Sequence, residues 1–222
     1  MGRDVEAPAP HVFGLVVPVK RVPVAKSRLQ PLGEHARRAL VTAFAVDTVS
    51  AALDCPLVGE VLVVTDEAEL ARGFRELGVA AVPDGESGSL NASLRQGAEE
   101  LLRRRPELVP AALCADLPAL RADELTVALR SAAGHYRAAF VADAAGSGTT
   151  LYTARRSADF EPRFGTRSRS AHLAAGAHEV VAAGIDSVRR DVDTPEDLRA
   201  AAALGLGPRT SFVVTSMRLL DD

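Results

Sequence analysis

Two aspartates that lie far apart in the sequence occupy similar settings. Asp116 follows the apolar segment 111–115 and precedes a Leu-Pro pair, and Asp193 separates an apolar run from an alanine-rich helical pattern. Carboxylates at the ends of strands can hold metal ions against a phosphate substrate. Either aspartate alone is also compatible with an ordinary turn before a helix. The two together favour a metal site.

The residues around Asp193 predict the start of a helix. Thr194 suits the N-cap, Pro195 suits the first turn, and the acidic residues 196–197 face the positive end of the helix dipole. Capping accounts for residues 194–197 but leaves Asp193 unexplained. Asp193 is therefore expected just outside the cap.

A cluster of four cations within nine residues follows the first predicted strand: Lys20, Arg21, Lys26 and Arg28. A solvated basic loop is one interpretation. Because the cluster lies at a strand end in a chain of negative net charge, binding of nucleotide phosphates is the other.

Three turns rich in small residues could bring backbone amides to a ligand. The first precedes a predicted helix beginning at Leu90 and Asn91, and it lacks the P-loop pattern. The others cover residues 146–150, with Thr150, and 164–168, with Gly165 and Ser168. Each alone could be an ordinary loop. His172 is the one histidine near such a turn, and no HExxH or GxSxG motif occurs.

The composition narrows the class of protein. A length of 222 residues, with 47% hydrophobic and 25% charged residues, fits one α/β domain. A net charge of −3 and an aromatic content of 4% argue against binding to nucleic acid or anionic membranes. Apolar runs are short and the N-terminus lacks a signal-peptide core, so a cytoplasmic protein is expected. The two cysteines lack CxxC spacing, so neither a disulfide nor a cysteine metal site is expected.

The hydrophobic pattern predicts alternating strands and helices. Strands are expected at residues 12–19, 60–65, 79–82, 111–115, 137–142 and 149–154, and helices at 34–53, 67–77, 90–105, 122–133 and 195–204. Such alternation predicts a mostly parallel sheet, whose ligands bind at the carboxyl ends of the strands. Lys20, Asp116 and Asp193 fall near such ends. Residues 149–183 are less regular and predict a small antiparallel insertion.

Three segments are expected along the chain. Residues 1–10 form a tail, residues 11–207 form the single domain, and residues 208–222 form a C-terminal tail in which residues 212–214 could add a small strand.

These motifs, in this order, resemble the guanylyltransferases of coenzyme F(420) biosynthesis, within the MobA-like nucleotidyltransferase superfamily. The resemblance spans about residues 12 to 206 and is carried by seven elements: Pro18-Val19-Lys20, Ala25 to Leu29, Ser89-Leu90-Asn91, Asp116-Leu117-Pro118, Gly148-Thr149-Thr150, Phe164-Gly165 with Ser168 and His172, and Asp191 to Leu198. It implies a Rossmann-like three-layer nucleotidyltransferase domain with a mostly parallel central sheet. The chain lacks the superfamily's GGxxxRMG-type phosphate loop, which argues against a molybdenum-cofactor or sugar nucleotidyltransferase.

The resemblance also implies roles for individual residues. Asp116 and Asp193 would bind Mg²⁺. The acceptor, phosphoenolpyruvate, would be bound by Thr150, Gly165 and Ser168. GTP would be bound by Lys20, Lys26, Arg28, Leu90 and Asn91, and Lys26 would act in catalysis beside the two aspartates.

The implied reaction is attack by the phosphate of a three-carbon phospho-acid on the α-phosphorus of GTP. Phosphoenolpyruvate is the expected acceptor, with 2-phospho-L-lactate and 3-phosphoglycerate as alternatives. A related nucleotidyltransferase that uses CTP, or that acts on a cofactor or sugar phosphate, remains open. So does a catalytically silent nucleotide-binding module. A homodimer is compatible with the sequence, which does not determine the oligomeric state.

Overall fold

A computed structural model describes the chain except for residues 1–11, 20–26, 86–88, 135 and 221–222. Its strands are β1 (Phe13–Pro18), β2 (Val58–Val64), β3 (Ala80–Val82), β4 (Val109–Leu113), β5 (Ala138–Ala142), β6 (Thr149–Ala154) and β7 (His178–Glu179). Its α-helices are α1 (Glu34–Leu53), α2 (Ala68–Glu76), α3 (Leu90–Arg104), α4 (Ala122–Ala132), α5 (Ser168–Ala174), α6 (Asp186–Arg189), α7 (Pro195–Leu204) and α8 (Pro208–Ser216). Two short 3-10 helices, η1 (Ser27–Leu32) and η2 (Ser157–Asp159), complete the described elements.

The strands form one seven-stranded sheet in the order β3-β2-β1-β4-β6-β5-β7. The pairs β1–β2, β1–β4, β2–β3 and β5–β7 are parallel, whereas β6 is antiparallel to both of its neighbours, β4 and β5. The predicted mostly parallel sheet with a small antiparallel part is therefore confirmed. The carboxyl ends of β1 and β4 meet at one edge, as expected for a ligand site.

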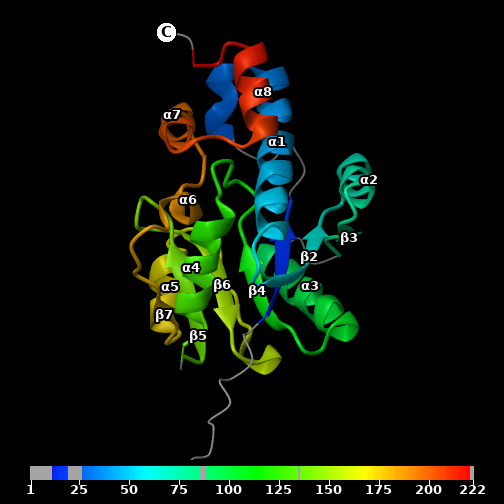
Figure 1. Cartoon of the computed structure of the whole chain (residues 1–222), viewed down its shortest axis with the longest axis vertical. Helices are drawn as coiled ribbons and strands as arrows, with labels where there is room; N and C mark the ends of the chain where they lie inside the picture. Colours follow the sequence, from blue (N-terminus) through cyan, green and yellow to red (C-terminus); the bar gives the residue numbers. More distant parts are fainter. Residues whose placement is uncertain (1–11, 20–26, 86–88, 135, 221–222) are drawn as a thin grey trace, which may run out of the picture.

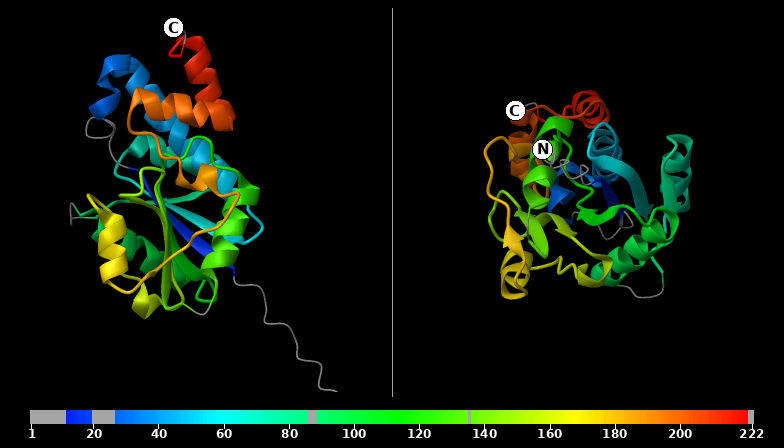
Figure 2. Two further views of the ribbon diagram at one scale, coloured as in Figure 1. Left: turned by 90° about the vertical axis from the view of Figure 1, so that its left-hand side faces the viewer. Right: turned by 60° about the horizontal axis from the view of Figure 1, so that its bottom comes forward.

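Helices cover both faces of the sheet (Figures 1 and 2). The alternation along β1 shows why: Leu15 and Val17 join the core under α1 and α4, and Val16 joins the core under α3. Gly97 lets α3 lie directly on the sheet, since a Cβ there would collide with Val16 and Val64. The three layers follow from apolar residues on both faces of a buried parallel strand.

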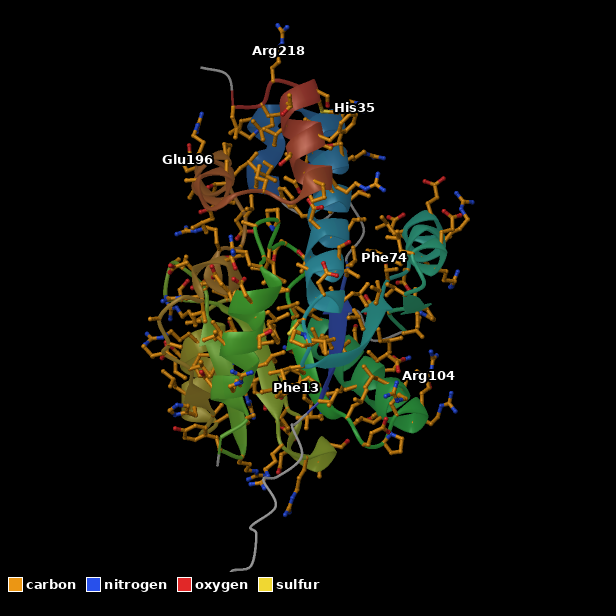
Figure 3. The ribbon with its side chains drawn as sticks, in the orientation of Figure 1. Phe13, His35, Phe74, Arg104, Glu196 and Arg218 are labelled. Carbon is orange, nitrogen blue, oxygen red and sulfur yellow. The ribbon has the colours of Figure 1, made fainter. Side chains whose placement is uncertain are left out.

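A third apolar cluster lies beyond the sheet, where α7 and α8 meet η1 and the first half of α1. It contains Leu40, Phe44, Val192 and Leu198 as buried members, with Val213 packed against them. Figure 1 shows α8 beside α1, and Figure 3 places His35 and Arg218 at this same end of the molecule. None of the described helices is long and apolar enough to cross a membrane.

The prediction of a C-terminal tail at residues 208–222 is wrong for most of that segment. Residues 208–216 form α8, and the small strand considered for residues 212–214 is part of this helix. Asp47 of α1 explains where the helix starts, because its carboxylate accepts hydrogen bonds from the backbone N–H groups of Arg209, at 3.0 Å, and Thr210, at 2.7 Å. This cap comes from residue 47, far away in sequence, so the local pattern could not reveal it.

Candidate active site

The two aspartates are brought together by a backbone hydrogen bond between their loops. The N–H of Val192 donates to the carbonyl oxygen of Asp116 at 3.1 Å. Asp193 is the next residue along the chain, and both aspartates are partly buried. Asp116 lies three residues beyond β4, which ends at Leu113. Asp116 thus follows a strand, as predicted, whereas the prediction that Asp193 follows a strand is wrong: the element before it is helix α6, Asp186–Arg189.

The helix start next to Asp193 follows the sequence prediction and adds a further contact. Thr194 and Asp197 form a capping box at the start of α7, with Pro195 in the first turn. The Asp197 carboxylate also accepts from the backbone N–H of Asp193 at 3.2 Å and from that of Thr194 at 2.9 Å. One side chain therefore caps the helix and fixes the backbone of Asp193.

Asp116 is supported by a residue that sequence reasoning missed. The hydroxyl of Thr48, on α1, accepts from the N–H of Leu117 at 3.1 Å and donates to the carbonyl of Ala115 at 3.3 Å. Thr48 is fully buried. A threonine within a helical pattern carries no sequence signal for such a contact.

Thr150 lies next to the Asp116 loop. The N–H of Cys114 donates to the carbonyl of Thr150 at 2.8 Å, which continues the β4–β6 pairing toward the aspartate. The Thr150 hydroxyl is buried, and it has no hydrogen-bond partner within the described part of the chain. A buried hydroxyl without a partner is costly unless a ligand or water completes it.

The turn before Thr150 is organised by Asp143. Its carboxylate accepts from the N–H groups of Ser147, at 2.8 Å, and Gly148, at 2.7 Å. A Cβ at residue 148 would collide with that carboxylate, which explains the glycine. The turn also meets α5, because the N–H of Arg169 donates to the carbonyl of Ser147 at 3.2 Å.

Gly165 and Ser168 lie together in the loop that leads into α5. The N–H of Ser168 donates to the carbonyl of Gly165 at 3.1 Å, and Ser168 is buried. Gly165 has a φ of 128°, a conformation that favours glycine. The loop ends with Arg167 in a left-handed conformation, with a φ of 58°. The structure thus brings these two predicted residues into one turn.

Asn91 and His172 hold this loop from two sides. The Asn91 amide donates to the carbonyl of Phe164 at 2.9 Å and accepts from its N–H at 2.7 Å. His172 Nε2 accepts from the N–H of Arg163 at 2.9 Å, and its Nδ1 is 3.0 Å from the Thr149 hydroxyl. Burial, and to a smaller extent the charge of Arg163, lower the pKa of His172 to about 4. The ring is therefore neutral and joins the loop to β6.

The start of α3 and the loop enclose a cleft of about 450 Å³. Asn91 and Gly165 both line it, together with Ser89, Arg95, Glu161, Pro162, Arg163, Phe164, Thr166 and Ala171. Leu90 begins α3 and packs against the core of that face. Asn91 and the predicted acceptor loop therefore face each other across this cleft, whereas Leu90 does not line it.

Of the basic segment, residues 20–28, the structure describes only the residue before it and the backbone at its end. Lys20 and Lys26 lie outside the described residues, and for Arg28 only the backbone, in η1, is described. The N–H of Val19 donates to the carbonyl of Val64 at 2.9 Å, so the segment starts at the carboxyl ends of β1 and β2. Contacts between these cations and phosphate remain a prediction.

The donor set suits a magnesium ion that arrives with its phosphate ligands. No group of three or more His, Cys, Asp or Glu side chains able to hold a metal occurs in the ranges that the structure describes. Magnesium takes one or two carboxylates and completes its shell with water and phosphate oxygens. Asp116 and Asp193 would supply the carboxylates.

Comparisons with solved structures define the class of protein. A nucleotidyl transferase from Methanothermobacter thermautotroptrophicus superposes with a TM-score of 0.61 at 20% identity, covering 87% of this chain and 97% of that one. A 4-diphosphocytidyl-2C-methyl-D-erythritol synthase superposes with a TM-score of 0.59 at 11% identity, covering 88% and 99%. The fold is that of the nucleotidyltransferases.

Sequence comparison identifies the family. The model of the "Guanylyl transferase CofC like" family matches residues 13–219, so the chain belongs to this family of enzymes. A phosphoenolpyruvate guanylyltransferase of Streptosporangium roseum is 51% identical over 204 residues, covering 92% of this chain and 91% of that protein. One of Streptomyces coelicolor is 50% identical over 204 residues, covering 91% and 96%. The resemblance and the α/β nucleotidyltransferase fold read from the sequence are confirmed.

Proposed function

We propose that this guanylyltransferase transfers GMP from GTP to the phosphate of phosphoenolpyruvate, forming enolpyruvyl-diphospho-5'-guanosine and pyrophosphate in the cytoplasm, as a step of coenzyme F(420) biosynthesis. Curated relatives about 50% identical along most of their length carry the name phosphoenolpyruvate guanylyltransferase, which supports this acceptor.

One structural observation carries the proposal. A continuous series of hydrogen bonds joins the Asp193 loop to Asp116, the Asp116 loop to Thr150, and the Gly165 loop to Asn91. His172 connects the second and third of these groups through its bond to Thr149. Loops chosen from separate motifs are thus linked to one another, and the buried Thr150 hydroxyl among them suits a phosphate oxygen.

The roles divide between two halves of the site. Lys20, Lys26 and Arg28 would hold the triphosphate, and the start of α3 at Leu90 and Asn91 would lie near the guanine. Thr150, Gly165 and Ser168 would hold the acceptor phosphate. Asp116 and Asp193, between the halves, would hold Mg²⁺. A solved structure with this fold contains manganese, which agrees with a divalent ion.

The chemistry requires alignment more than proton transfer. An oxygen of the acceptor phosphate forms a bond to the α-phosphorus of GTP, while the bond to the bridging oxygen breaks and pyrophosphate leaves. The nucleophile is already anionic, so no general base is needed. Lys26 would neutralise charge on the leaving pyrophosphate, and the hydroxyls of Thr150 and Ser168 would orient the nucleophile. Bound Mg²⁺ would supply further charge neutralisation across the reacting phosphates.

Mass spectrometry of reaction products tests this function. The protein would be incubated with Mg²⁺ and either GTP or CTP, in parallel with phosphoenolpyruvate, 2-phospho-L-lactate and 3-phosphoglycerate. The proposal expects a guanylylated enolpyruvyl product and pyrophosphate only with GTP, and fastest with phosphoenolpyruvate. Asp116→Asn serves as the inactive control. Faster turnover of another acceptor would reassign the substrate, and no product from any pair would contradict the activity.

A further inference from the structure

Thr48 connects helix α1 to the aspartate loop across the core of the molecule. Its hydroxyl is 3.1 Å from the N–H of Leu117 and 3.3 Å from the carbonyl of Ala115, the residues on either side of Asp116. A hydroxyl can donate and accept at once, so one buried atom satisfies both backbone groups.

One local hydrogen bond, from the N–H of Leu120 to the carbonyl of Leu117 at 2.9 Å, orders the end of this stretch of backbone, but it does not reach Asp116 itself. β4 ends at Leu113 and α4 begins only at Ala122, so residues 114–121 are irregular. Distant residues hold the part around Asp116: Thr48 on one side, the N–H of Val192 on the carbonyl of Asp116, and the N–H of Gly207, which donates to the carbonyl of Pro118 at 2.7 Å. At the end of the segment, the Ser187 hydroxyl accepts from the N–H of Arg121 at 3.1 Å. Thr48 makes its contacts through a side chain, and its two hydrogen bonds bracket the aspartate itself.

The helix that carries Thr48 is itself firmly anchored. Its C-terminal half packs in the main core through Ala45, Val49 and Ala52. The neighbouring Asp47 caps α8, which ties the same turn of α1 to the C-terminal segment. Thr48 therefore connects an irregular loop to a firmly packed helix.

We propose that Thr48 is a positioning residue for Asp116 and that it sets the affinity of the site for its divalent ion. The inference rests on the proposed function in one respect, namely that Asp116 is a metal ligand. Groups that orient a ligand without touching the metal commonly change its affinity by about 10–100-fold when they are removed.

Three variants separate this role from mere stability. Thr48→Val keeps the shape of the side chain but leaves Leu117 N–H and Ala115 C=O without their partner. Thr48→Ser keeps the hydroxyl. Thr153→Val is the matched control, because the buried Thr153 hydroxyl donates to the carbonyl of Pro110, at 2.8 Å, on the same strand β4 and away from its carboxyl end.

Two readouts decide the question. Binding of Mn²⁺ to each protein is measured from the loss of the free-ion electron paramagnetic resonance signal. The Mg²⁺ concentration for half-maximal pyrophosphate release is measured at saturating substrates. Thr48→Val should weaken Mn²⁺ binding and raise the Mg²⁺ requirement by about tenfold, and Thr48→Ser should remain near wild type. Thr153→Val should lower the melting temperature without changing either metal readout.

Unchanged metal readouts in a folded Thr48→Val protein would overturn the inference, as would an equal shift in Thr153→Val. If Thr48→Val does not fold, Thr48→Cys, whose thiol is a weak donor and acceptor, should give an intermediate shift. The variant Asp116→Asn distinguishes a failure of the proposed metal site from a failure of the inference about Thr48. Normal metal binding in Asp116→Asn would refute the metal site and with it the inference, whereas lost binding there beside a normal Thr48→Val refutes the inference alone.

Discussion

At the scale of single residues, the two aspartates are held in different ways. Asp193 is placed by its own neighbours, because the capping residue Asp197 accepts from its backbone N–H. Asp116 is placed by tertiary contacts, from Thr48 and from Val192. The local arrangement is visible in the sequence as a capping pattern, and the tertiary one is not.

Replacing Asp193 by asparagine should abolish turnover and leave the fold intact. The hydrogen bond to Asp197 uses the Asp193 backbone, so the substitution does not remove it. Asparagine keeps the shape of the side chain but lacks the charge that holds Mg²⁺. We expect a loss of at least about a hundredfold in kcat, beyond the 10–100-fold typical of groups that only orient a ligand. Pyrophosphate release and circular dichroism check this, and near-normal activity in the folded variant would remove Asp193 from the site.

His172 should make stability depend on pH. Burial lowers its pKa from 6.5 to about 4, so between these values the unfolded chain binds a proton that the folded protein excludes. The contribution of His172 to the free energy of unfolding is therefore complete above pH 6.5 and falls as the pH decreases toward 4. Urea unfolding at pH 7, 6 and 5 should show this decline in wild type and a smaller one in His172→Gln, which cannot titrate. Parallel declines in the two proteins would contradict the assignment.

At the scale of elements, the start of α7 couples helix stability to the aspartate. Thr194→Ala removes the hydroxyl that accepts from Asp197 N–H at 3.1 Å and donates to the Asp197 carboxylate at 2.8 Å. Loss of such a cap costs about 1 kcal/mol of unfolding free energy. Because Asp197 also fixes the backbone of Asp193, kcat should fall as well. Urea unfolding and steady-state kinetics measure the two effects, and Thr194→Ser should restore both. A stability loss with unchanged kcat would show that the cap does not influence Asp193.

The loop before α5 depends on Asn91 of α3. Both polar atoms of its amide are bonded to the backbone of Phe164, directly before Gly165. Asn91→Ala should therefore raise KM for the acceptor by about tenfold or more, from two hydrogen bonds worth about 1 kcal/mol each. The KM for GTP reports separately on whether this residue also lies near the guanine. An acceptor KM equal to that of wild type would contradict the clamp.

Local patterns predicted most elements because hydrophobic period and capping act within a few residues. The helices at residues 34–53 and 195–204 and the strand at residues 149–154 begin and end where the sequence placed them. Elements fixed by distant contacts were less visible. The helix α8 takes its cap from Asp47 and its packing from α1, and its own sequence, with Phe212-Val213-Val214, favours a strand.

The site followed the same division. Motif order and strand ends predicted Asp116, Asp193, Thr150, Gly165 and Ser168 as site residues, and hydrogen bonds link the Asp193 loop to Asp116 and the Asp116 loop to Thr150. Their roles stay a prediction. The supporting residues Thr48 and Asp143 were not identified, because a buried hydroxyl or carboxylate that bonds distant backbone has no characteristic spacing. His172 was singled out only because it is near the Gly165 loop in the sequence. Its hydrogen bonds to Thr149 and to the backbone of Arg163 connect that loop to β6.

At the scale of the whole molecule, the order of the strands supports the proposed division of the site into two halves. The parallel strands β1 and β2, from whose ends the basic segment departs, form one side of β4, and the antiparallel β6 with the α5 loop forms the other. A nucleotide on the first side and a small phospho-acid on the second would meet over the Asp116 loop, which follows the strand between them. In this proposed arrangement each substrate would contact its own set of residues, and Asn91, which bonds the backbone of Phe164, would lie where the two sets meet.

Two substitutions should separate these halves. Ser168→Ala should weaken the acceptor by about 1 kcal/mol, or several-fold in affinity, because one neutral hydroxyl contact is lost. GTP affinity should hardly change. Lys26→Ala should lower kcat/KM for GTP through a lost phosphate contact and leave acceptor affinity near wild type.

Separate titrations of phosphoenolpyruvate and GTP against both variants give four values, and the expected pattern has one large effect in each variant, on opposite substrates. If Ser168→Ala weakens GTP and Lys26→Ala weakens the acceptor, the halves are reversed. Equal losses of both substrates in both variants would mean that the two substrates share one set of contacts, and the division by β4 would fail.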